Sequence, residues 1–286
     1  MAYQYTERLS DAVIGLAIGD ALGVPFEFEE RGSFTCTGMT GSGVHNMPAG
    51  TWSDDTSMTI ATAKGLRDYN GEIHPGAIRR NFVNWLRQGD FTPDGKCFGI
   101  GRATFVSLTT GESQSRFEDN GNGALMRILP LSFTDAVDDQ IDEVSGITHG
   151  HGISKTACRI YVHVARRLLA GQTIIEILPS LIGEAPFGRL SKIDQLPEDE
   201  IKSSGYVIDT LEAALWAMAK EALEPAEEDG DRFAGAVLRA VNLGGDTDTI
   251  GAVTGGLAGI VYGLDGARAS QWRAALRKRE LIEECL

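Results

Sequence analysis

The sequence predicts an all-α fold, and three observations support this prediction. Apolar residues recur at the three- and four-residue spacing of a helix face along most of the chain. Runs in which apolar and polar residues alternate, which are typical of half-buried strands, are scarce. No repeat of fixed period is present, so a solenoid of stacked repeats is not indicated. We therefore expect one compact multi-helix domain that spans residues 1–286.

Residues that start and stop helices define the first elements. The first helix carries apolar residues at helical spacing over Leu9–Ala17 and is stopped by Gly23 and Pro25. Ser53 is a favourable N-cap for a second helix, whose apolar positions continue to residue 66.

The later helices are predicted from the same signals. Pro75 suits the first turn of a third helix, whose apolar stripe continues to Leu86. Ser154 begins a fourth helix, which stops at Gly171. Four further helices are expected in the C-terminal part of the chain: Asp209–Glu221, Asp231–Val241, Thr249–Tyr262 and Ala269–Glu283.

Two segments between these helices lack a helical pattern. Arg31–Ala49 is rich in Gly, Ser and Thr, and we expect an ordered loop there, near the first acidic cluster described below. Gly183–Gly205 contains two prolines and several charges, which makes it the best candidate for a mobile surface stretch. Neither segment has the composition of a domain boundary.

The composition argues against two classes of partner. Of the 286 residues, 42% are hydrophobic, which is enough to bury a sizeable core. The formal net charge is −14. Non-specific binding to nucleic acid and docking on anionic membranes both require basic surface, so we expect neither partner.

The cysteines and apolar stretches suggest a cytoplasmic protein. The four cysteines are scattered without a CxxC pair, which indicates reduced thiols rather than disulfides or a zinc site. The apolar stretch Val13–Leu22 contains Asp20 and lacks a basic leader, so we do not expect a signal peptide. Ile250–Leu264 is too short and too rich in glycine to predict a membrane span.

Two acidic clusters near opposite ends of the chain are its most informative feature. Each lies at a predicted helix start among small and apolar residues, and each includes hydroxyl side chains. Carboxylates crowded in apolar surroundings repel one another and lose hydration, so they need a neutralising partner. The candidate metal ligands are Ser53, Asp54, Asp55, Asp246, Asp248 and Thr249.

If the fold brings the clusters together, they form a metal site made only of oxygen ligands. Such a donor set favours Mg²⁺, Mn²⁺ or Ca²⁺ over zinc or copper, and two divalent ions would balance the four carboxylates. In an extended stretch the side chains of Asp246 and Asp248 would point the same way. Gly244 and Gly245 would let the backbone approach an ion or ligand closely. The alternative is that each cluster only caps its helix, as Asp and Ser often do.

The first helix contains a glycine-rich stretch with one acidic residue. Gly15–Gly23 resembles a dinucleotide-binding fingerprint only superficially, because no strand precedes it and no βαβ unit follows. We expect its small residues to let helices pack closely, and Asp20 to be a buried structural hydrogen-bonding residue. Glu27 could act in acid–base chemistry, position a water or be an ordinary loop carboxylate, and its spacing alone favours the last.

A second group of glycine-rich and polar motifs lies in the middle of the chain. Gly121–Arg127 is a polar entry into a short predicted helix, and its N–H groups could bind phosphate with help from Arg127. The alternative is a helix cap with an ordinary salt-bridging arginine. Phe98–Gly101 is another tight glycine loop, and its signal alone is weak. His149 and His151 fit no standard metal motif, so we prefer a hydrogen-bonding or substrate-facing role.

Taken in order, these motifs resemble those of the ADP-ribosylglycohydrolase family. That family includes the dinitrogenase reductase-activating glycohydrolase and the protein-ADP-ribosylarginine hydrolases. No single motif is decisive, but the ordered set is highly specific and spans nearly the whole chain. The matching pieces are Gly19–Gly23 with Glu27, Thr51–Thr56, Gly121–Arg127, Thr148–His149 and Gly244–Thr249.

The resemblance implies an all-α fold of this family's type, with a two-metal centre in a cleft. The six residues of the acidic clusters match the metal-ligand positions, and Ser53 stands where many members have Thr. Glu27 matches a carboxylate implicated in catalysis or gating. The positions implied to bind ADP-ribose are Gly99, Gly101, Gly121, Asn122, Gly123, Ala124, Met126, Arg127 and His149. One departure is Gly99, because some bacterial members carry in this segment an Asp that is linked to handling the ribose.

Three functions are compatible with these residues. The first is hydrolysis of an ADP-ribosyl bond on a modified protein, with arginine as the expected linkage and two Mg²⁺ or Mn²⁺ ions as cofactors. Asp55 and Glu27 are then the candidates for activating water or moving protons. ADP-ribosyl-serine and O-acetyl-ADP-ribose are alternative substrates. The second function is non-catalytic binding of ADP-ribose, and the third is another two-metal hydrolase, such as a phosphoesterase.

Overall fold

The computed structural model describes residues 6–183, 185–225 and 230–286, and these residues form helices and loops without a β-sheet. The predicted all-α class is confirmed. In chain order the elements are α1 (Glu7–Gly23), η1 (Val24–Phe26), α2 (Asp54–Arg67), α3 (Pro75–Gln88), α4 (Arg102–Thr110), η2 (Phe117–Asp119), η3 (Asn122–Arg127), η4 (Leu129–Phe133), α5 (Asp138–Ser145), α6 (Gly152–Leu169), α7 (Ile174–Ile177), η5 (Leu178–Ser180), η6 (Leu190–Gln195), η7 (Glu198–Glu200), α8 (Val207–Leu223), α9 (Arg232–Val241), α10 (Thr247–Tyr262), α11 (Ala267–Ala275) and α12 (Arg279–Cys285), where η marks a 3-10 helix.

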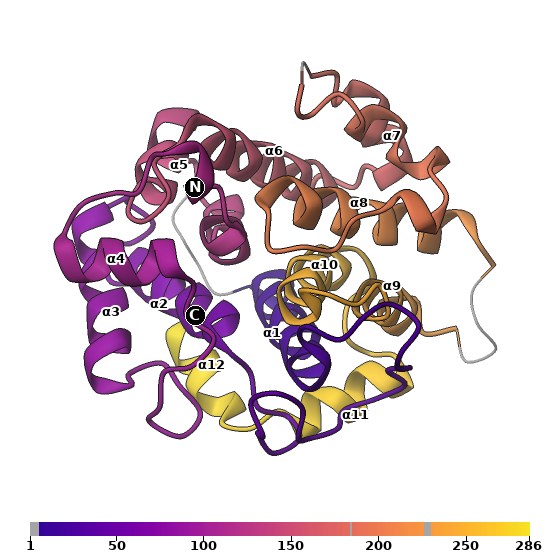
Figure 1. Ribbon diagram of the computed structural model, residues 1–286, viewed down its shortest axis with the longest axis horizontal. Helices are drawn as coiled ribbons and strands as arrows, with labels where there is room; N and C mark the ends of the chain where they lie inside the picture. Colours follow the sequence, from indigo (N-terminus) through magenta and orange to yellow (C-terminus); the bar gives the residue numbers. More distant parts are fainter. Residues whose placement is uncertain (1–5, 184, 226–229) are drawn as a thin grey trace.

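Two helices, α1 and α10, form the centre of the molecule (Figure 1). They run antiparallel, because Gly15 lies against Gly255 while Gly19 lies against Gly251. A methyl group added at Gly19 would be 2.0 Å from the carbonyl oxygen of Gly251, so the two backbones are in contact. The small residues of the first helix therefore serve close helix packing, as expected.

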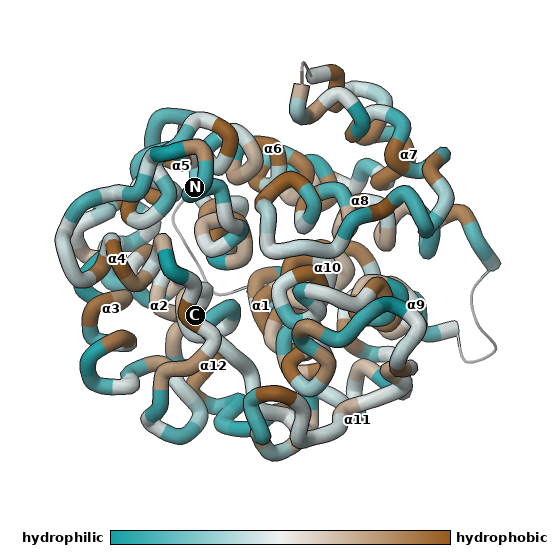
Figure 2. The backbone as a smooth tube through the Cα atoms, in the orientation of Figure 1, coloured by the Kyte–Doolittle hydropathy of each residue, from teal (hydrophilic) through white to brown (hydrophobic). Residues whose placement is uncertain are grey.

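Apolar residues are frequent in and around this central pair, whereas the outer loops are mostly polar (Figure 2). By length and composition, the 20-residue segment Glu7–Phe26 is the one described stretch that could cross a membrane. In this fold 89% of its apolar window is buried by other parts of the chain, which is the environment of a core helix.

Several predicted helix boundaries differ from the structure. The helix α10 begins two residues earlier than expected, so Asp246 is its N-cap and Asp248 lies in its first turn. The expectation that these two residues lie in an extended stretch was therefore wrong. The predicted helix Ala269–Glu283 is divided into α11 and α12, and Lys278 between them has a φ of +50°. The short helices α4 and α5 were not predicted.

The two segments without a helical pattern are both packed against the rest of the fold where they are described. Arg31–Ala49 contains an antiparallel bridge between Ser42 and Met47. In the other segment, Leu196 accepts a hydrogen bond from the Trp216 indole at 3.0 Å, which attaches it to α8. Apart from residue 184, which lies outside the described residues, the segment predicted to be mobile thus has defined contacts with its neighbours.

The antiparallel arrangement of α1 and α10 decides where the acidic clusters meet. The last residue of α1, Gly23, lies against the backbone of Asp248 in the first turn of α10. The Thr247 hydroxyl donates a hydrogen bond to the Gly23 carbonyl at 2.7 Å. Glu27, which follows α1 closely, is therefore placed beside the second acidic cluster.

Candidate metal centre and cleft

Asp20 attaches the first acidic cluster to α1. Its carboxylate accepts hydrogen bonds from the Ser53 N–H at 2.9 Å, the Thr56 N–H at 3.0 Å and the Thr56 hydroxyl at 2.6 Å. Burial raises the pKa of Asp20 to about 6, while these hydrogen bonds act in the opposite direction. The carboxylate thus caps the start of α2, which is the structural role expected for it.

The structure brings the two acidic clusters into direct contact. Ser53 is the N-cap of α2, and its hydroxyl lies 3.1 Å from Asp55 Oδ2. The Thr249 hydroxyl, from the first turn of α10, donates to the same oxygen at 3.3 Å. Residues 194 positions apart in the sequence are therefore neighbours.

A group of three carboxylates includes the second acidic cluster. Glu27, Asp246 and Asp248 each place a carboxylate oxygen within 4.8 Å of the other two, which is close enough for a shared cation. The Asn122 amide donates a hydrogen bond to Asp246 Oδ2 at 2.7 Å and another to the Thr210 hydroxyl at 2.9 Å. Asp246 is thus held in place by the glycine-rich loop of η3.

Asp54, Asp55, Asp246 and Asp248, together with Glu27, form what we call the acidic centre. Burial, and then the neighbouring carboxylates, raise the pKa of Asp54, Asp55 and Asp248 well above the ordinary value. Burial is also the largest cause of the raised pKa of Glu27.

The donors of the acidic centre fit a hard divalent cation. Among the described residues, no lysine or arginine forms an ion pair with these five carboxylates. Asp55 Oδ1 is buried and has no hydrogen-bond partner. A buried carboxylate oxygen without a partner is costly, and a bound cation would satisfy it. Of the predicted metal ligands, Asp246 and Asp248 therefore have both the chemistry and the proximity that such an ion requires, and Glu27 joins them.

Gly244 and Gly245 serve the protein's own packing. Their φ values are +73° and +72°, in the left-handed region that favours glycine. A methyl group added at Gly245 would lie 2.2 Å from the Ser203 carbonyl oxygen, and one added at Gly244 would lie 2.6 Å from the Arg31 nitrogen. Both glycines thus allow close approach to other backbone segments, and the expected approach to an ion or ligand stays a prediction.

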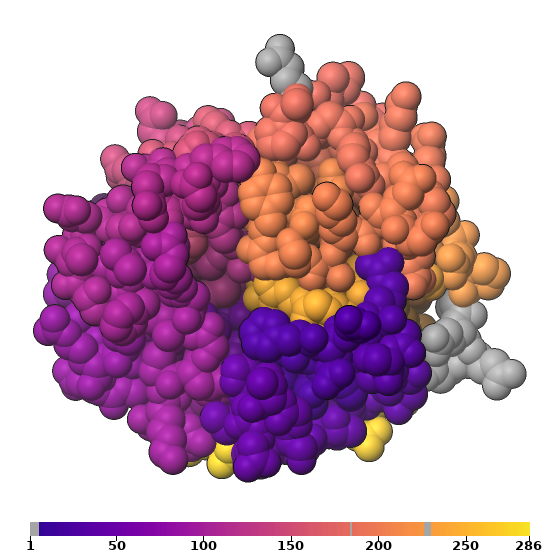
Figure 3. All heavy atoms as spheres, viewed as in Figure 1, coloured from indigo at the N-terminus to yellow at the C-terminus, as the bar shows by residue number. Residues whose placement is uncertain are grey.

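A cleft with a volume of about 380 Å³ opens beside the acidic centre. The surface view shows a hollow where purple, orange and indigo segments meet above a gold floor (Figure 3). The predicted site residues that line the cleft are Glu27, Asp54, Gly99, Gly101, Gly121, Asn122, Gly123, Met126, His149, Asp246, Asp248 and Thr249. Ser53, Asp55, Ala124 and Arg127 lie outside this lining.

Arg127 lies behind the glycine-rich loop. Its side chain is fully buried and stacks over the Phe82 ring, with 4.5 Å between the guanidinium carbon and the ring centroid. The guanidinium donates to the Val144 carbonyl at 3.3 Å and to the Thr148 hydroxyl at 2.8 Å. Burial lowers its pKa to about 10. Arg127 therefore has neither the position for a direct phosphate contact nor the ordinary salt bridge offered as the alternative. It supports the glycine-rich loop from within the core.

His149 faces the cleft as a neutral hydrogen-bond donor. Burial, and then the charge of Arg127, lower its pKa to about 3. The Thr148 hydroxyl accepts from Arg127, so its own hydrogen is available to His149 Nδ1 at 2.8 Å. With the Thr148 hydroxyl as donor in this contact, the ring hydrogen is on Nε2. The ring lies against Gly121 and Gly123. His151 instead caps the start of α6 and accepts from the Ile153 N–H.

The geometry at Gly99 explains why this chain has no side chain there. Gly99 has a φ of +81°, which L side chains rarely adopt. A methyl group at this position would also lie 2.3 Å from Asp54 Oδ1. An Asp at position 99 would therefore require the acidic centre to shift.

Several residues at the cleft were not predicted from the sequence. His45 Nε2 contacts Glu27 Oε2, and the His45 ring packs against Phe98 with 5.1 Å between centroids. Arg102 lines the cleft and forms an ion pair with Asp119. The members of each pair, His45 with Glu27 and Arg102 with Asp119, are not linked by any spacing that a motif would show. For the Arg31–Ala49 loop, which contains His45, we expected only a position near the first acidic cluster.

Comparisons with known proteins show to which family the chain is similar. The family model described as ADP-ribosylglycohydrolase matches residues 1–286. The chain is 33% identical to the ADP-ribosylarginine hydrolase Tri1 of Serratia proteamaculans (strain 568), over 96% of this chain and 77% of the relative. It is 29% identical to the ADP-ribosyl-dinitrogen reductase glycohydrolase of Rhodospirillum rubrum, over 91% of this chain and 87% of the relative. A solved structure described as an ADP-ribosylglycohydrolase-related protein complex matches with a TM-score of 0.80 and 30% identity, over 98% of this chain and 95% of that one.

Proposed function

The chain is a hydrolase that belongs to the ADP-ribosylglycohydrolase family, and we propose that it removes ADP-ribose from modified arginine side chains of proteins. The observation that carries the proposal is the acidic centre, where carboxylates from both ends of the chain converge at a cleft without a lysine or arginine partner. Two relatives, at 33% and 31% identity, are named ADP-ribosylarginine hydrolases, which supports arginine as the linkage.

We propose that the acidic centre holds two divalent cations, Mg²⁺ or Mn²⁺. The proposed ligands are Ser53, Asp54, Asp55, Asp246, Asp248 and Thr249. When bound, such ions would hold the vicinal hydroxyls of the substrate ribose and lower the pKa of a water molecule. The protein keeps the donors in position: Asp20 caps the helix that carries the first cluster, and Asn122 holds Asp246.

Proton transfer is assigned to Glu27. Hydrolysis breaks the bond from the anomeric carbon to the guanidine nitrogen and forms a bond from that carbon to the oxygen of water. Because the water loses a proton and the guanidine gains one, a single carboxyl group in the cleft could serve both transfers. Glu27 lines the cleft, whereas Asp55 does not. Burial raises the pKa of Glu27, so its carboxyl group holds a proton more readily. Because Asp55 lies outside the cleft lining, we assign cation binding to it.

The wall opposite Glu27 is proposed to bind the rest of ADP-ribose. Gly121 and Gly123 expose backbone at the cleft, and His149 presents its Nε2 hydrogen beside them. A neutral donor and backbone N–H groups can bind phosphate or ribose oxygens. Ala124 and Arg127 would act from behind this wall, since neither lines the cleft.

A direct comparison of substrates tests the proposal. The protein should release ADP-ribose from ADP-ribosyl-arginine with Mg²⁺ and lose this activity in EDTA, whereas ADP-ribosyl-serine and O-acetyl-ADP-ribose should be poorer substrates. Binding of ADP-ribose without turnover of any of the three would indicate a non-catalytic protein. Release of phosphate or AMP from ADP-ribose would indicate a phosphoesterase.

The domain organisation and the cellular location expected from the sequence stay predictions. We propose that residues 1–286 act as one domain, which limited proteolysis would test by the absence of separately stable fragments. We also propose that the protein works in the cytoplasm, which cell fractionation would test.

A further inference from the structure

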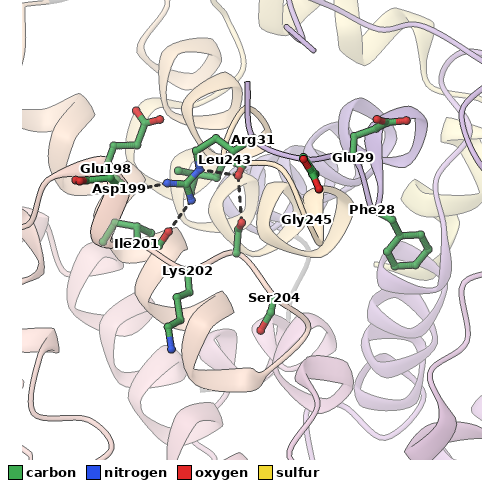
Figure 4. Close-up of a pocket in the computed structure, with 12 residues that line it drawn as sticks. Phe28, Glu29, Arg31, Glu198, Asp199, Ile201, Lys202, Ser204, Leu243 and Gly245 are labelled. Carbon is green, nitrogen blue, oxygen red and sulfur yellow. Dashed lines mark hydrogen bonds between the residues drawn. The ribbon is translucent and has the colours of Figure 1, made fainter. Parts of the chain in front are cut away.

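A shallow groove lies next to the cleft. We call it the acidic groove and define it by Phe28, Glu29, Glu30, Glu198 and Asp199, and its volume is about 900 Å³. In the close-up, Phe28 lies at one end of the groove and Glu198 with Asp199 at the other (Figure 4). The groove is thus built from three segments that are distant in the sequence: the chain just after α1, η7 with the residues that follow it, and Leu243 with Gly245 before α10.

The acidic groove and the cleft are continuous. Phe28 lines both of them. Ser204 of the groove is followed in the chain by Gly205 of the cleft, and Gly245 of the groove by Asp246 of the cleft. A protein whose modified side chain enters the cleft can therefore reach this part of the surface.

The charges in the groove favour a cationic occupant. Among the described residues, its four carboxylates form no ion pair and no side-chain hydrogen bond. Arg31 lies in the middle of the groove, but its guanidinium is committed to the carbonyl oxygens of Leu243 at 2.9 Å, Glu198 at 2.5 Å and Ile201 at 2.5 Å (Figure 4). Lys202 is the other cation of the lining. Four carboxylates thus outnumber two cations, one of which is already bound to backbone.

Phe28 supplies an apolar contact at the boundary between groove and cleft. It is 68% exposed, which is unusual for so large an apolar side chain. Its N–H donates to the Gly245 carbonyl at 2.7 Å, and the Gly245 N–H donates to the Glu29 carbonyl at 2.8 Å, so its backbone is held firmly. Aromatic faces bind the stems and charged heads of lysine and arginine.

We propose that the acidic groove binds the segment of the target protein that flanks the modified arginine, and that it selects segments carrying lysine or arginine. This inference rests on the proposed function, because only a protein substrate extends out of the cleft. Three features support it together: continuity with the cleft, an excess of unpaired carboxylates and an exposed aromatic ring at the boundary. Complementary charge of this kind speeds association and selects among partners.

The test compares three substrates that differ only outside the cleft. They are free ADP-ribosyl-arginine, a peptide with one ADP-ribosylated arginine between lysines, and the same peptide with glutamates in place of the lysines. A groove variant combines Glu29→Gln, Glu30→Gln, Glu198→Gln and Asp199→Asn. We expect its kcat/KM for the lysine-flanked peptide to fall about tenfold, mainly through KM, because four exposed charge pairs contribute modestly each. For free ADP-ribosyl-arginine the kcat/KM should be unchanged.

Salt dependence provides a second measurement. In the unsubstituted protein, raising the ionic strength from about 0.05 M to about 0.5 M should lower kcat/KM for the lysine-flanked peptide but hardly affect the free compound. The groove variant should lose this difference. A matched control combines Glu72→Gln, Asp90→Asn, Glu112→Gln and Glu143→Gln, which are exposed carboxylates that line neither the groove nor the cleft. It has the same change in net charge and should keep the full preference for the lysine-flanked peptide.

Removing the free cation of the groove should have the opposite effect. Lys202→Gln is expected to raise kcat/KM for the lysine-flanked peptide about twofold, consistent with the loss of one exposed like charge. Equal activity of the groove variant and the control variant on the lysine-flanked peptide would overturn the inference while leaving the proposed function intact. No turnover of free ADP-ribosyl-arginine by the unsubstituted protein would overturn the proposed function, and this inference with it.

Discussion

Buried carboxylates occur in two different settings in this molecule. In the lining of the cleft, the buried carboxylate of Asp119 forms ion pairs with Arg102 and Arg116, which are more than half exposed. Hydrogen bonds from Arg116 are the largest cause that lowers the pKa of Asp119 to about 2. Glu212 on α8 also has a cationic partner, because it lies 3.5 Å from Arg189, although burial raises its pKa. These carboxylates have protein cations as partners.

The acidic centre shows the opposite behaviour. Asp54, Asp55 and Asp248 are equally buried, yet their neighbours are further carboxylates, and burial raises their pKa. A protein stabilises itself by pairing its buried charges, so a group of unpaired ones is a cost to stability that a cation from solution can remove. The comparison indicates that Asp119 serves the fold, whereas the acidic centre serves a ligand.

The largest expected effect is on catalytic activity, which should fall on substitution in the acidic centre but hardly change on substitution of the ion-paired Asp119. Asp55→Asn keeps the shape of the side chain but removes a charge from the acidic centre, so kcat should fall at least about a thousandfold, or about 4 kcal/mol in the activation free energy. Asp119→Asn should reduce kcat less than about tenfold, because its partners can be solvated. The measurement is Mg²⁺-dependent release of ADP-ribose from ADP-ribosyl-arginine. Undiminished turnover by Asp55→Asn would remove the acidic centre from the mechanism.

The second effect is stabilisation by added cation. At a free Mg²⁺ or Mn²⁺ concentration of about 100 times Kd, the free energy of unfolding should rise by about 2.7 kcal/mol. Thermal melting with and without EDTA measures this change. The rise should disappear in Asp248→Asn and persist in Asp119→Asn. Equal stabilisation of both variants would mean that the cation binds somewhere else.

The third effect concerns the ion-paired carboxylate. Asp119→Asn should lower the free energy of unfolding by about 1–2 kcal/mol at neutral pH, because charge-assisted hydrogen bonds are lost while the exposed guanidiniums stay hydrated. Urea unfolding at several pH values measures this loss. No effect on stability at pH 7 would show that the two arginines contribute nothing through Asp119.

The sign of the pH dependence follows from the lowered pKa of Asp119. The contribution to stability is fully present above the ordinary Asp pKa of 3.8 and is lost as the pH falls towards about 2. The difference between the unsubstituted protein and Asp119→Asn should therefore shrink between about pH 4 and pH 2. A difference that grows on acidification would contradict this account.

The smallest effect has the opposite sign. In EDTA, Asp55→Asn should raise the free energy of unfolding by about 1 kcal/mol, because it removes one charge from a group of buried, mutually repelling carboxylates. Chemical unfolding in EDTA measures it, and Asp119→Asn provides the contrast, since the same chemical change should destabilise the protein there. Destabilisation by both changes would erase the distinction between the two settings.

Much of the fold was accessible from local sequence signals. The helical period and the capping residues located α1, α2, α3, α6, α8, α9 and α10, since these signals depend on residues a few positions apart. The division between α11 and α12 was missed, because the left-handed residue Lys278 carries no breaker signal. The prediction of an extended backbone at Asp246 and Asp248 was wrong, because a two-residue spacing does not reveal the helix that begins at Thr247.

The all-α class and the identity of the oxygen donors follow from the sequence, because helical period and residue type are local properties. Only the tertiary structure decided which groups meet: Asp55 with Thr249, Glu27 with His45, and Arg127 with Val144 inside the core rather than a ligand at the cleft. It also decided that Phe28 lies where groove and cleft join. Such contacts depend on the antiparallel packing of α1 against α10. The free energy of that packing comes from many residues that are too far apart in the sequence to form a motif.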